Sequence, residues 1–446
     1  MKINILCFGF GPSHLVYSEI IKKCNWINKS YCLSQTSTYE TENIKVFGED
    51  NYYSLENIDL SDSSASQTTV DATIMDVDKK RFTKHQAKFK ELYFEIVKDR
   101  IIKIFDEFKP DLILFSKSVE VPEGILLYDL AKKRNILCAI PHSLRFLGGS
   151  FFSQSPFERE FDFLKKNDFK GFIDYDISSL PMLYETPLPK PLIIHSLLKR
   201  LKRFYKLLSK KPYNFTLMVV KIRLSNSFFK NRKFRKFRSR LIYKSYSIHP
   251  DYSQKYIYYP LHVTPETSIN IPNPFFIDQL RAIDKIRYNL PPNYMLYIKE
   301  HPVGLAKRNT TFYNKLNNLS RVRLIDIDIE SKELILNSQC VISVTGTACL
   351  EAFFLKKPSF TIGDAFFSNF LKNDFTSLKK EKFHYPTDEE IQFALNAFKS
   401  NSSDFVAFTP DYFNVTEHKN ILNYIKSLEE FLFDNETFRQ GSINIQ

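Results

Sequence analysis

The sequence predicts an α/β protein with two parallel-sheet domains, and three observations lead to that prediction. The chain has 446 residues, and 43% of them are hydrophobic, which is enough to fill two cores. Apolar strand patterns alternate with helical patterns in both halves, as expected for doubly wound parallel sheets. A segment from about Leu180 to Ser247, poor in acidic residues and dense in basic and aromatic ones, separates the two halves.

The N-terminal half begins with a strand, a loop and a helix. The run Ile3 to Phe8 is apolar, which is typical of a buried strand, and Gly9 to Ser13 turns the chain into the amphipathic stretch His14 to Lys23. The later elements of this half follow the same alternation. They are the helix His85–Phe108, the strand Leu112–Phe115, the helix Ile125–Arg134 and the strand Ile136–Ile140.

The C-terminal half repeats the alternation of strands and helices. Short apolar runs predict four strands, and the amphipathic stretches between them predict helices. The strands are Tyr256–Pro260, Met295–Lys299, Arg321–Ile325 and Cys340–Val344, and the helices are Pro274–Tyr288 and Ser331–Asn337. One more helix is predicted in the tail, over Glu417–Phe433.

These patterns predict four regions along the chain. Residues 1–180 form an N-terminal Rossmann-like domain, and residues 181–250 form a basic helical connector. Residues 251–410 form a C-terminal Rossmann-like domain, and residues 411–446 form a C-terminal helix and tail.

The sequence predicts a soluble, cytoplasmic protein. The apolar start of the chain is short and breaks at Gly9 and Gly11, and no run approaches the roughly 18 apolar residues that a membrane-spanning helix needs. The six cysteines are scattered, without a paired motif or a nearby histidine at metal-ligand spacing. We therefore expect buried, reduced thiols.

The positive charge is concentrated in the connector. The net charge is +13, a value that an AT-rich coding bias toward Lys also produces, but the segments 197–211 and 229–244 are far more basic than the average. Basic amphipathic helices bind anionic membrane surfaces, and the plain alternative is a solvated helix face. We expect contact with the inner membrane surface or a lipid-linked acceptor. Nucleic acid is not expected, because no recognised reader motif accompanies the charge.

Polar residues follow two predicted strands of the C-terminal half. The strand that ends at Lys299 is followed directly by Glu300, His301 and Pro302, and the loop after the strand Tyr256–Pro260 carries His262 and Glu266. Ligands of α/β sheets bind at the carboxyl ends of the strands. Three ionisable side chains at one strand end suit an anionic ligand, although His beside Pro is often structural. By its position alone, Glu266 is equally a loop-capping residue.

The strand Cys340–Val344 leads into a loop of small hydroxyl residues. Ser343, Thr345, Gly346 and Thr347 precede a helix that is predicted to begin at about Thr347. Free backbone N–H groups, the helix dipole and the hydroxyls form a phosphate cradle. Ordinary N-capping needs one hydroxyl and explains neither the glycine nor the repetition. Glu351, one turn into the helix, is placed to reach ribose hydroxyls.

The order of these motifs resembles a known family. The stretches YYPLHVTPETS, FFIDQLRAIDKI, LYIKEHP and SVTGTACLEAFFLKKPSFTIGDAFF look like the bacterial capsule polysaccharide biosynthesis family, which includes the β-Kdo transferases. The likeness covers about Tyr256 to Phe367 well, and more loosely the N-terminal stretch PDLILFSKSVEVPEGILLYDLAKKRNILCAIPHSLR.

The resemblance implies a GT-B fold, in which the two Rossmann-type domains face a cleft. The N-terminal domain, residues 1–180, would be the acceptor domain, and the C-terminal domain, residues 251–410, would hold a CMP-sugar donor. The family's HP motif falls on His301 and Pro302, where the histidine would meet the donor phosphate. Its QPE motif falls on Thr264, Pro265 and Glu266, with Thr264 in place of the usual Gln. Its Ser/Thr-rich motif falls on Ser343, Thr345, Gly346 and Thr347.

The implied activity is transfer of Kdo or a similar nonulosonate into capsule or lipopolysaccharide glycan. Leaving-group stabilisation is assigned to His301, Lys299 and the hydroxyl loop, and no metal and no cofactor are expected. The candidate catalytic carboxylates are Glu266, Glu300 and Glu123, the last of which would face the acceptor. The strands that end at Lys299 and Ser343 are expected to lie side by side.

Two alternatives remain open at this stage. One is a CDP-glycerol or CDP-ribitol phosphotransferase of cell-surface polymer synthesis, which also resembles GT-B proteins with a His-Pro pair at a strand end. The other is a non-catalytic scaffold, which the replacement of the family Gln by Thr264 would favour.

Overall fold

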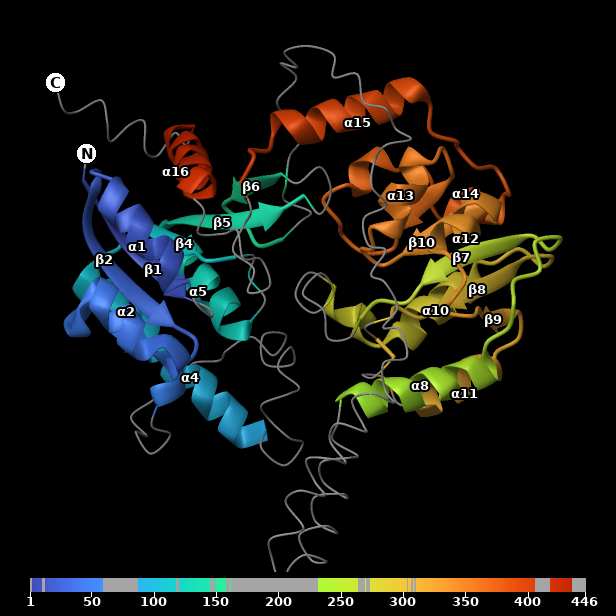
Figure 1. Cartoon of the computed structure of the whole chain (residues 1–446), viewed down its shortest axis with the longest axis horizontal. Coiled ribbons are helices and arrows are strands. Elements are labelled where there is room, and N and C mark those ends of the chain that lie inside the picture. Colours follow the sequence, from blue (N-terminus) through green and yellow to red (C-terminus); the bar gives the residue numbers. More distant parts are fainter. Residues whose placement is uncertain are drawn as a thin grey trace, which may run out of the picture. The chain divides into compact units, whose positions relative to one another are not determined.

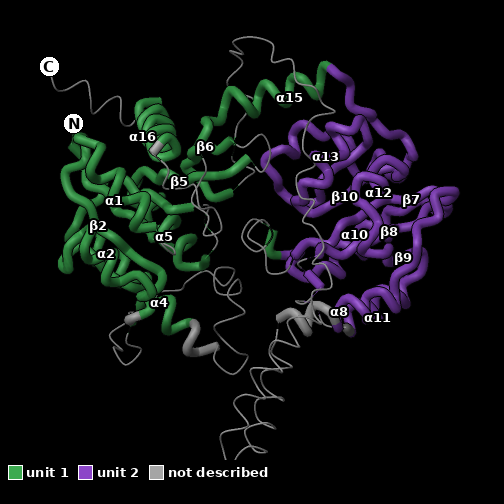
Figure 2. Tube along the Cα trace, in the orientation of Figure 1, with its two compact units in different colours: residues 1–181, 267–274, 389–446 green, residues 182–266, 275–388 purple. Residues whose placement is uncertain are grey.

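The computed structural model contains two compact units (Figure 2). Unit 1 comprises residues 1–181, 267–274 and 389–446, and unit 2 comprises residues 182–266 and 275–388. The structure describes residues 2–9, 13–58, 87–117, 119, 121–144, 149–157, 161, 232–263, 269, 273–302, 304–305, 308, 310–405 and 418–434. Residues 389–410, which we predicted in the second domain, group with unit 1.

Unit 1 is built on a six-stranded sheet in the order β3-β2-β1-β4-β5-β6. The first five strands run parallel, as predicted, whereas β6 pairs with β5 in the antiparallel direction. The strands are β1 (Ile3–Gly9), β2 (Ile27–Ser34), β3 (Tyr52–Ser54), β4 (Leu112–Phe115), β5 (Leu137–Ser143) and β6 (Ser150–Ser153).

Helices cover both faces of this sheet (Figure 1). The side chains of β1 alternate between two cores, one on each face. Ile3, Ile5 and Cys7 pack with helices α1, α2 and α16, while Leu6 and Phe8 pack with α4 and α5. The helices of this unit are α1 (His14–Lys23), α2 (Glu40–Phe47), α4 (Ala87–Phe108), α5 (Pro122–Lys133), α15 (Asp388–Ser400, in unit 1 from residue 389) and α16 (His418–Phe433).

Unit 2 holds a five-stranded, wholly parallel sheet in the order β11-β10-β7-β8-β9. Its strands are β7 (Tyr256–Pro260), β8 (Met295–Lys299), β9 (Val322–Leu324), β10 (Cys340–Ser343) and β11 (Ser359–Thr361). Its helices are α8 (Arg232–Tyr246), α10 (Gln279–Tyr288), α11 (Thr310–Asn317), α12 (Ser331–Asn337), α13 (Ala348–Phe354) and α14 (Phe375–Lys379).

The expected α/β class with two Rossmann-like parallel sheets is therefore confirmed. Several elements begin at residues other than those predicted, and in three of them the local backbone explains the difference. Helix α5 begins at Pro122, because proline suits the first turn of a helix, where its missing N–H costs nothing. Strand β9 begins after Arg321, whose φ of 60° is left-handed. Residues 274–277 form a separate 3-10 turn before α10.

The described part of the connector is helix α8, which belongs to unit 2. Its Tyr243 is fully buried, and two of its basic residues, Arg240 and Lys244, form ion pairs with Asp328. The basic segment 197–211 lies outside the described residues. Within the described part of the chain, no helix has both the length and the apolar character that crossing a membrane requires.

Candidate functional site

The candidate site of unit 2 lies where the direction of its sheet connections changes. The chain passes from β7 to β8 and β9 on one side, and from β10 to β11 on the other. In open α/β sheets, ligands bind at this switch point, outside the carboxyl ends of the strands. The two strand ends that border it are followed by His262 after β7 and by residues 344–347 after β10.

The loop after β10 is closed by Ser343. Its Oγ accepts a hydrogen bond from the Gly346 N–H at 2.7 Å and lies 3.2 Å from the Gly346 carbonyl oxygen, to which it donates. A Cβ atom on Gly346 would stand 3.1 Å from the same Oγ. The predicted hydroxyl of Ser343 is thus buried and engaged within the loop, and the glycine lets the loop close tightly.

His262 joins the ends of β7 and β10. Its Nε2 accepts a hydrogen bond from the backbone N–H of Thr345 at 3.4 Å, and its side chain is buried. For Nε2 to accept, the imidazole must be neutral with its proton on Nδ1. The ring also lies against Gly346, where an added Cβ would stand 3.4 Å from Cε1. No local sequence pattern distinguishes His262 as a site residue, although, like His301, it follows a buried strand.

Gln279, the first residue of α10, holds the end of β7. Its Oε1 accepts hydrogen bonds from the Tyr259 hydroxyl at 2.9 Å and from the His262 N–H at 3.3 Å. Its Nε2 donates to the Phe276 carbonyl at 2.8 Å. All of its polar atoms are therefore used inside the protein, which fixes the backbone from which His262 projects.

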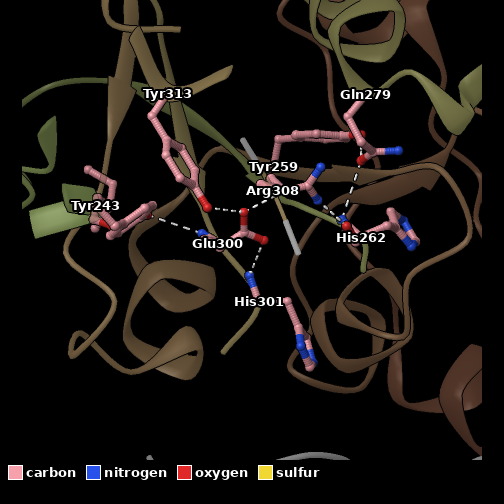
Figure 3. Close-up of polar contacts among 9 residues, drawn as sticks. Tyr243, Tyr259, His262, Gln279, Glu300, His301, Arg308 and Tyr313 are labelled. Carbon is pink, nitrogen blue, oxygen red and sulfur yellow. Dashed lines mark hydrogen bonds and ion pairs between the residues drawn. The ribbon is translucent and has the colours of Figure 1, made fainter. Parts of the chain in front are cut away.

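Glu300 forms a buried polar network directly after β8 (Figure 3). Its carboxylate pairs with Arg308 and accepts hydrogen bonds from the Tyr313 hydroxyl at 2.8 Å and the His301 N–H at 2.9 Å. Arg308 also donates to the His262 carbonyl oxygen. Burial raises the pKa of Glu300, and Arg308 and the hydrogen-bond donors oppose that rise. This network connects the ends of β7 and β8.

His301 stands at the end of this network, with its side chain outside it. Figure 3 shows its imidazole directed away from the Glu300 carboxylate, while its backbone N–H is held by that carboxylate. The ring is partly exposed, and Pro302 follows in a turn. Gly304 completes the turn, since a Cβ there would stand 2.4 Å from Glu300 Oε1. Glu300 therefore fixes the backbone of His301.

Lys299 is buried, and its ammonium group is directed to the loop between β9 and α12. It donates to the Ile329 carbonyl oxygen and to Ser331 Oγ at 3.2 Å. Burial lowers the pKa of Lys299 to about 8, against the opposing effect of Asp328 and other nearby carboxylates. The predicted anion-binding lysine thus has two partners within the protein.

Thr347 and Glu351 lie on the α13 side of the site. Thr347 occupies the N-cap position of α13, but its side chain makes no capping hydrogen bond, and it is partly exposed. Burial raises the pKa of Glu351 to about 7. A carboxyl group with such a pKa exchanges a proton near neutral pH, which suits either hydrogen bonding to a sugar hydroxyl or proton transfer.

The other two carboxylate candidates lie elsewhere. Glu266, together with Thr264 and Pro265, falls outside the described residues. Glu123 is fully buried in the first turn of α5 in unit 1, where its carboxylate accepts hydrogen bonds from the Tyr93 hydroxyl at 2.9 Å and from Gln35 Nε2 at 3.5 Å.

The strands carrying Lys299 and Ser343 end at the same edge of the sheet but are not neighbours. Strand β7 lies between β8 and β10, so the expectation of adjacent strand ends was wrong in this respect. The distance is bridged by His262, which bonds to Thr345 on one side and, through its carbonyl oxygen, to Arg308 on the other. Sequence reasoning missed Arg308, Gln279, Tyr313 and Tyr243, because no local pattern marks them.

The family model described as capsule polysaccharide biosynthesis protein matches residues 215–374. The match includes the ends of β7, β8 and β10 and confirms the resemblance inferred from the motifs. Among curated proteins, no sequence matches the chain.

The comparison with solved structures finds a transferase and several epimerases, all of low sequence identity to this chain. KpsC of Thermosulfurimonas dismutans, a β-Kdo 2,7 transferase, is 10% identical, with a TM-score of 0.37 over 96% of this chain and 99% of that one. The UDP-GlcNAc 2-epimerase of Neisseria meningitidis is 14% identical, with a TM-score of 0.24 over 98% and 100%. That of Rickettsia bellii is 13% identical, with a TM-score of 0.25 over the same shares.

Proposed function

We propose that the chain is a glycosyltransferase that uses a CMP-activated sugar, such as CMP-Kdo or a similar nonulosonate, to build capsule or lipopolysaccharide glycan. One observation supports this more than any other. The switch point of unit 2 is bordered by His262 and the loop Ser343–Thr347, and it falls within residues 215–374, which the family model matches. Ligands of parallel sheets bind at such a switch point.

In this proposal the donor phosphate lies against the loop after β10. Gly346 allows close approach, and the partly exposed Thr347 hydroxyl makes no cap and is available to a phosphate oxygen. Ser343 and Thr345 fix the backbone of the loop, because Ser343 Oγ accepts the Gly346 N–H and the Thr345 N–H donates to His262 Nε2. Glu351, whose pKa is raised to about 7, receives the ribose hydroxyls.

His301 stabilises the leaving group. When the bond between the sugar and CMP breaks, negative charge grows on the phosphate while the sugar becomes oxocarbenium-like. A donor placed beforehand at the phosphate lowers that barrier, and Glu300 positions His301 by accepting its N–H at 2.9 Å. Glu300 is thus a positioning residue, since its carboxylate is held by Arg308 and Tyr313. Glu266 remains the candidate carboxylate at the sugar.

Donor cleavage tests the proposal. The purified chain is incubated with CMP-Kdo, CMP-sialate and CDP-glycerol, and release of CMP or CDP is measured for the wild type, for His301→Ala and for the control His249→Ala, a substitution at an exposed histidine of the same unit. We expect a CMP-sugar to be cleaved and His301→Ala to lose about 100-fold or more in rate. Cleavage by His301→Ala at the wild-type rate would refute the assignment.

The same assay separates the alternatives. Cleavage of CDP-glycerol alone would assign the chain to polyol-phosphate transfer. Binding of CMP without turnover on any donor would assign it to the scaffold class. Both outcomes contradict the proposed reaction.

We further propose that the protein is cytoplasmic and that it reaches a lipid-linked acceptor at the inner membrane surface through residues 197–211. In the described part of α8, Arg240 and Lys244 already pair with Asp328, so that helix has less free charge for lipid than its sequence suggests. Sedimentation with anionic vesicles tests the contact. Replacing the basic residues of 197–211 by Gln should abolish co-sedimentation, and unchanged co-sedimentation would contradict it.

A further inference from the structure

The hydrogen-bond ladder between β8 and β9 indicates where its next bond should lie. The Leu296 N–H donates to the Arg321 carbonyl oxygen at 2.8 Å. Two residues along, the Ile298 carbonyl oxygen accepts the Ile325 N–H, also at 2.8 Å. The bonds of a parallel pair are evenly spaced, so donors on β8 recur at every second residue. The series therefore places the next bond between the Glu300 N–H and the Ile325 carbonyl oxygen.

The hydroxyl of Tyr243, from helix α8, is inserted at this place. It accepts the Glu300 N–H at 3.1 Å and donates to the Ile325 carbonyl oxygen at 2.6 Å. A hydroxyl can do both, because it has one proton to donate and lone pairs that accept. Tyr243 is fully buried, and burial raises the pKa of its hydroxyl well above the usual value, so the proton is retained. A side chain of α8 thus bridges the ends of β8 and β9.

Helix α8 is fastened to β9 and the loop after it by further contacts. The Ile248 N–H, two residues beyond the helix, donates to the Leu324 carbonyl oxygen at 2.9 Å. The Asp326 N–H donates to the Ile248 carbonyl oxygen at 3.0 Å. On the helix itself, Arg240 pairs with Asp328. The Tyr243 hydroxyl therefore reaches the end of β8 from an element that is held in place independently of it.

The two peptide groups that precede the Cα atom of His301 are each held by a side chain. Tyr243 accepts the Glu300 N–H, and the Glu300 carboxylate accepts the His301 N–H at 2.9 Å. Tyr313 donates to the same carboxylate, and its ring packs edge to face on the ring of Tyr243, with centroids 5.2 Å apart. Figure 3 shows this arrangement around Glu300. A change at the Tyr243 hydroxyl is thus passed to the backbone from which the His301 ring projects.

We propose that Tyr243 is a positioning residue for His301. Its hydroxyl sets the backbone of Glu300 at the end of β8, and Glu300 in turn sets the backbone of His301. The consequence for catalysis rests on the proposed function, in which His301 stabilises the leaving group. The inference gives α8, the described part of the connector, a role at the site that is separate from the membrane contact proposed for residues 197–211.

NMR of the full chain carrying isotope-labelled histidine follows the His301 ring without any donor. Its Cε1–H signal is identified by its loss in His301→Ala. Tyr243→Phe removes the hydroxyl and keeps the ring, and it should shift this signal. The matched control is Tyr256→Phe, since Tyr256 is also fully buried and its hydroxyl donates to the Leu334 carbonyl oxygen at 2.8 Å, at the amino end of β7. An unmoved signal in Tyr243→Phe, or an equal shift in the control, would overturn the proposal.

Donor cleavage measures the consequence for catalysis. Tyr243→Phe should lower kcat about 10-fold with little change in KM, because a misplaced His301 weakens an interaction made in the transition state. In the His301→Ala background the same substitution should have no further effect, whereas a purely structural defect would lower the rate equally in both backgrounds. Provided that His301→Ala is itself impaired, equal losses in both backgrounds or an unchanged kcat in Tyr243→Phe would overturn the proposal.

The two proposals can fail separately. If Tyr243→Phe shifts the His301 signal but His301→Ala cleaves the donor at the wild-type rate, the proposed role of His301 is refuted and its positioning by Tyr243 stands. If His301→Ala loses activity but the signal does not move in Tyr243→Phe, the positioning is refuted and the proposed function stands.

Discussion

Replacing Arg308 by Met should destabilise unit 2 more than any surface substitution, because it leaves the Glu300 carboxylate buried without its counter-charge. The exposed fractions of the two side chains are 8% for Arg308 and 0% for Glu300, which places the pair in the buried class. Removing one partner of a buried pair costs about 3–5 kcal/mol, whereas exposed pairs are worth about 0–1 kcal/mol. We therefore expect a loss of about 4 kcal/mol.

The assay must resolve the two units, since a single melting curve would mix them. Hydrogen exchange of a peptide covering β8 reports on unit 2 alone. A loss of about 4 kcal/mol corresponds to exchange roughly 1,000-fold faster where exchange follows unfolding. The control is Arg287→Met, since Arg287 pairs at 3.0 Å with Asp284, which is 63% exposed. That variant should lose less than about 1 kcal/mol.

The deficit of Arg308→Met should also depend on pH. Burial raises the pKa of Glu300, and without Arg308 less opposes that rise. Above the raised pKa, Glu300 is charged and buried without a counter-charge, so the variant has its full loss of folding stability. As the pH falls through that pKa, Glu300 is protonated and the loss of stability becomes smaller. The double variant Glu300→Gln with Arg308→Met should regain most of the loss. A deficit below about 1 kcal/mol at pH 8, or one independent of pH between 5 and 8, would refute the buried-pair reasoning.

Three other predictions concern neighbouring features. Gly304→Ala should destabilise unit 2 by about 1–3 kcal/mol and weaken CMP binding, because the new Cβ would stand 2.4 Å from Glu300 Oε1. A titration by calorimetry that finds wild-type CMP affinity in this variant would contradict the prediction. Burial lowers the pKa of Lys299 to about 8 in the folded state, so between pH 8 and 10 the unfolded chain holds this proton more tightly. The free energy of unfolding of the wild type should therefore rise relative to that of Lys299→Met as the pH rises from 8 to 10. A difference between the two proteins that does not change with pH would contradict this prediction. All six cysteines are buried and unpaired, so Ellman's reagent should react only after unfolding, and prompt labelling would count against the packing.

Much of the fold could be predicted from the sequence, because its central strands are buried on both faces and therefore apolar throughout. The strands Leu112–Phe115, Tyr256–Pro260 and Met295–Lys299 have the predicted bounds, as does the helix His14–Lys23. The strand β2 was missed, since its first half, Ile27 to Tyr31, carries polar side chains and is partly exposed. The short strands β3, β6 and β11 owe their pairing to tertiary contacts rather than to a local pattern.

The site was predicted in part, for a related reason. Polar residues that directly follow a buried strand, such as His301 and Thr345, could be found because the strand end is visible in the sequence. Arg308 and Gln279 could not, since their roles depend on bonds to His262 and Glu300, which are distant in sequence. The order of the strands in the sheet, with β7 between β8 and β10, differs from their order along the chain. The position of His262 between the two strand ends was therefore visible only in the structure.

The most direct test of the account is hydrogen exchange of the whole chain with and without CMP. If the nucleotide binds at the carboxyl ends of β7 and β10, peptides containing His262 and the loop Ser343–Thr347 should become protected, and those of β9 and α11 should not. Protection confined to other parts of unit 2 or to unit 1, or no protection at saturating CMP, would contradict the proposed donor site.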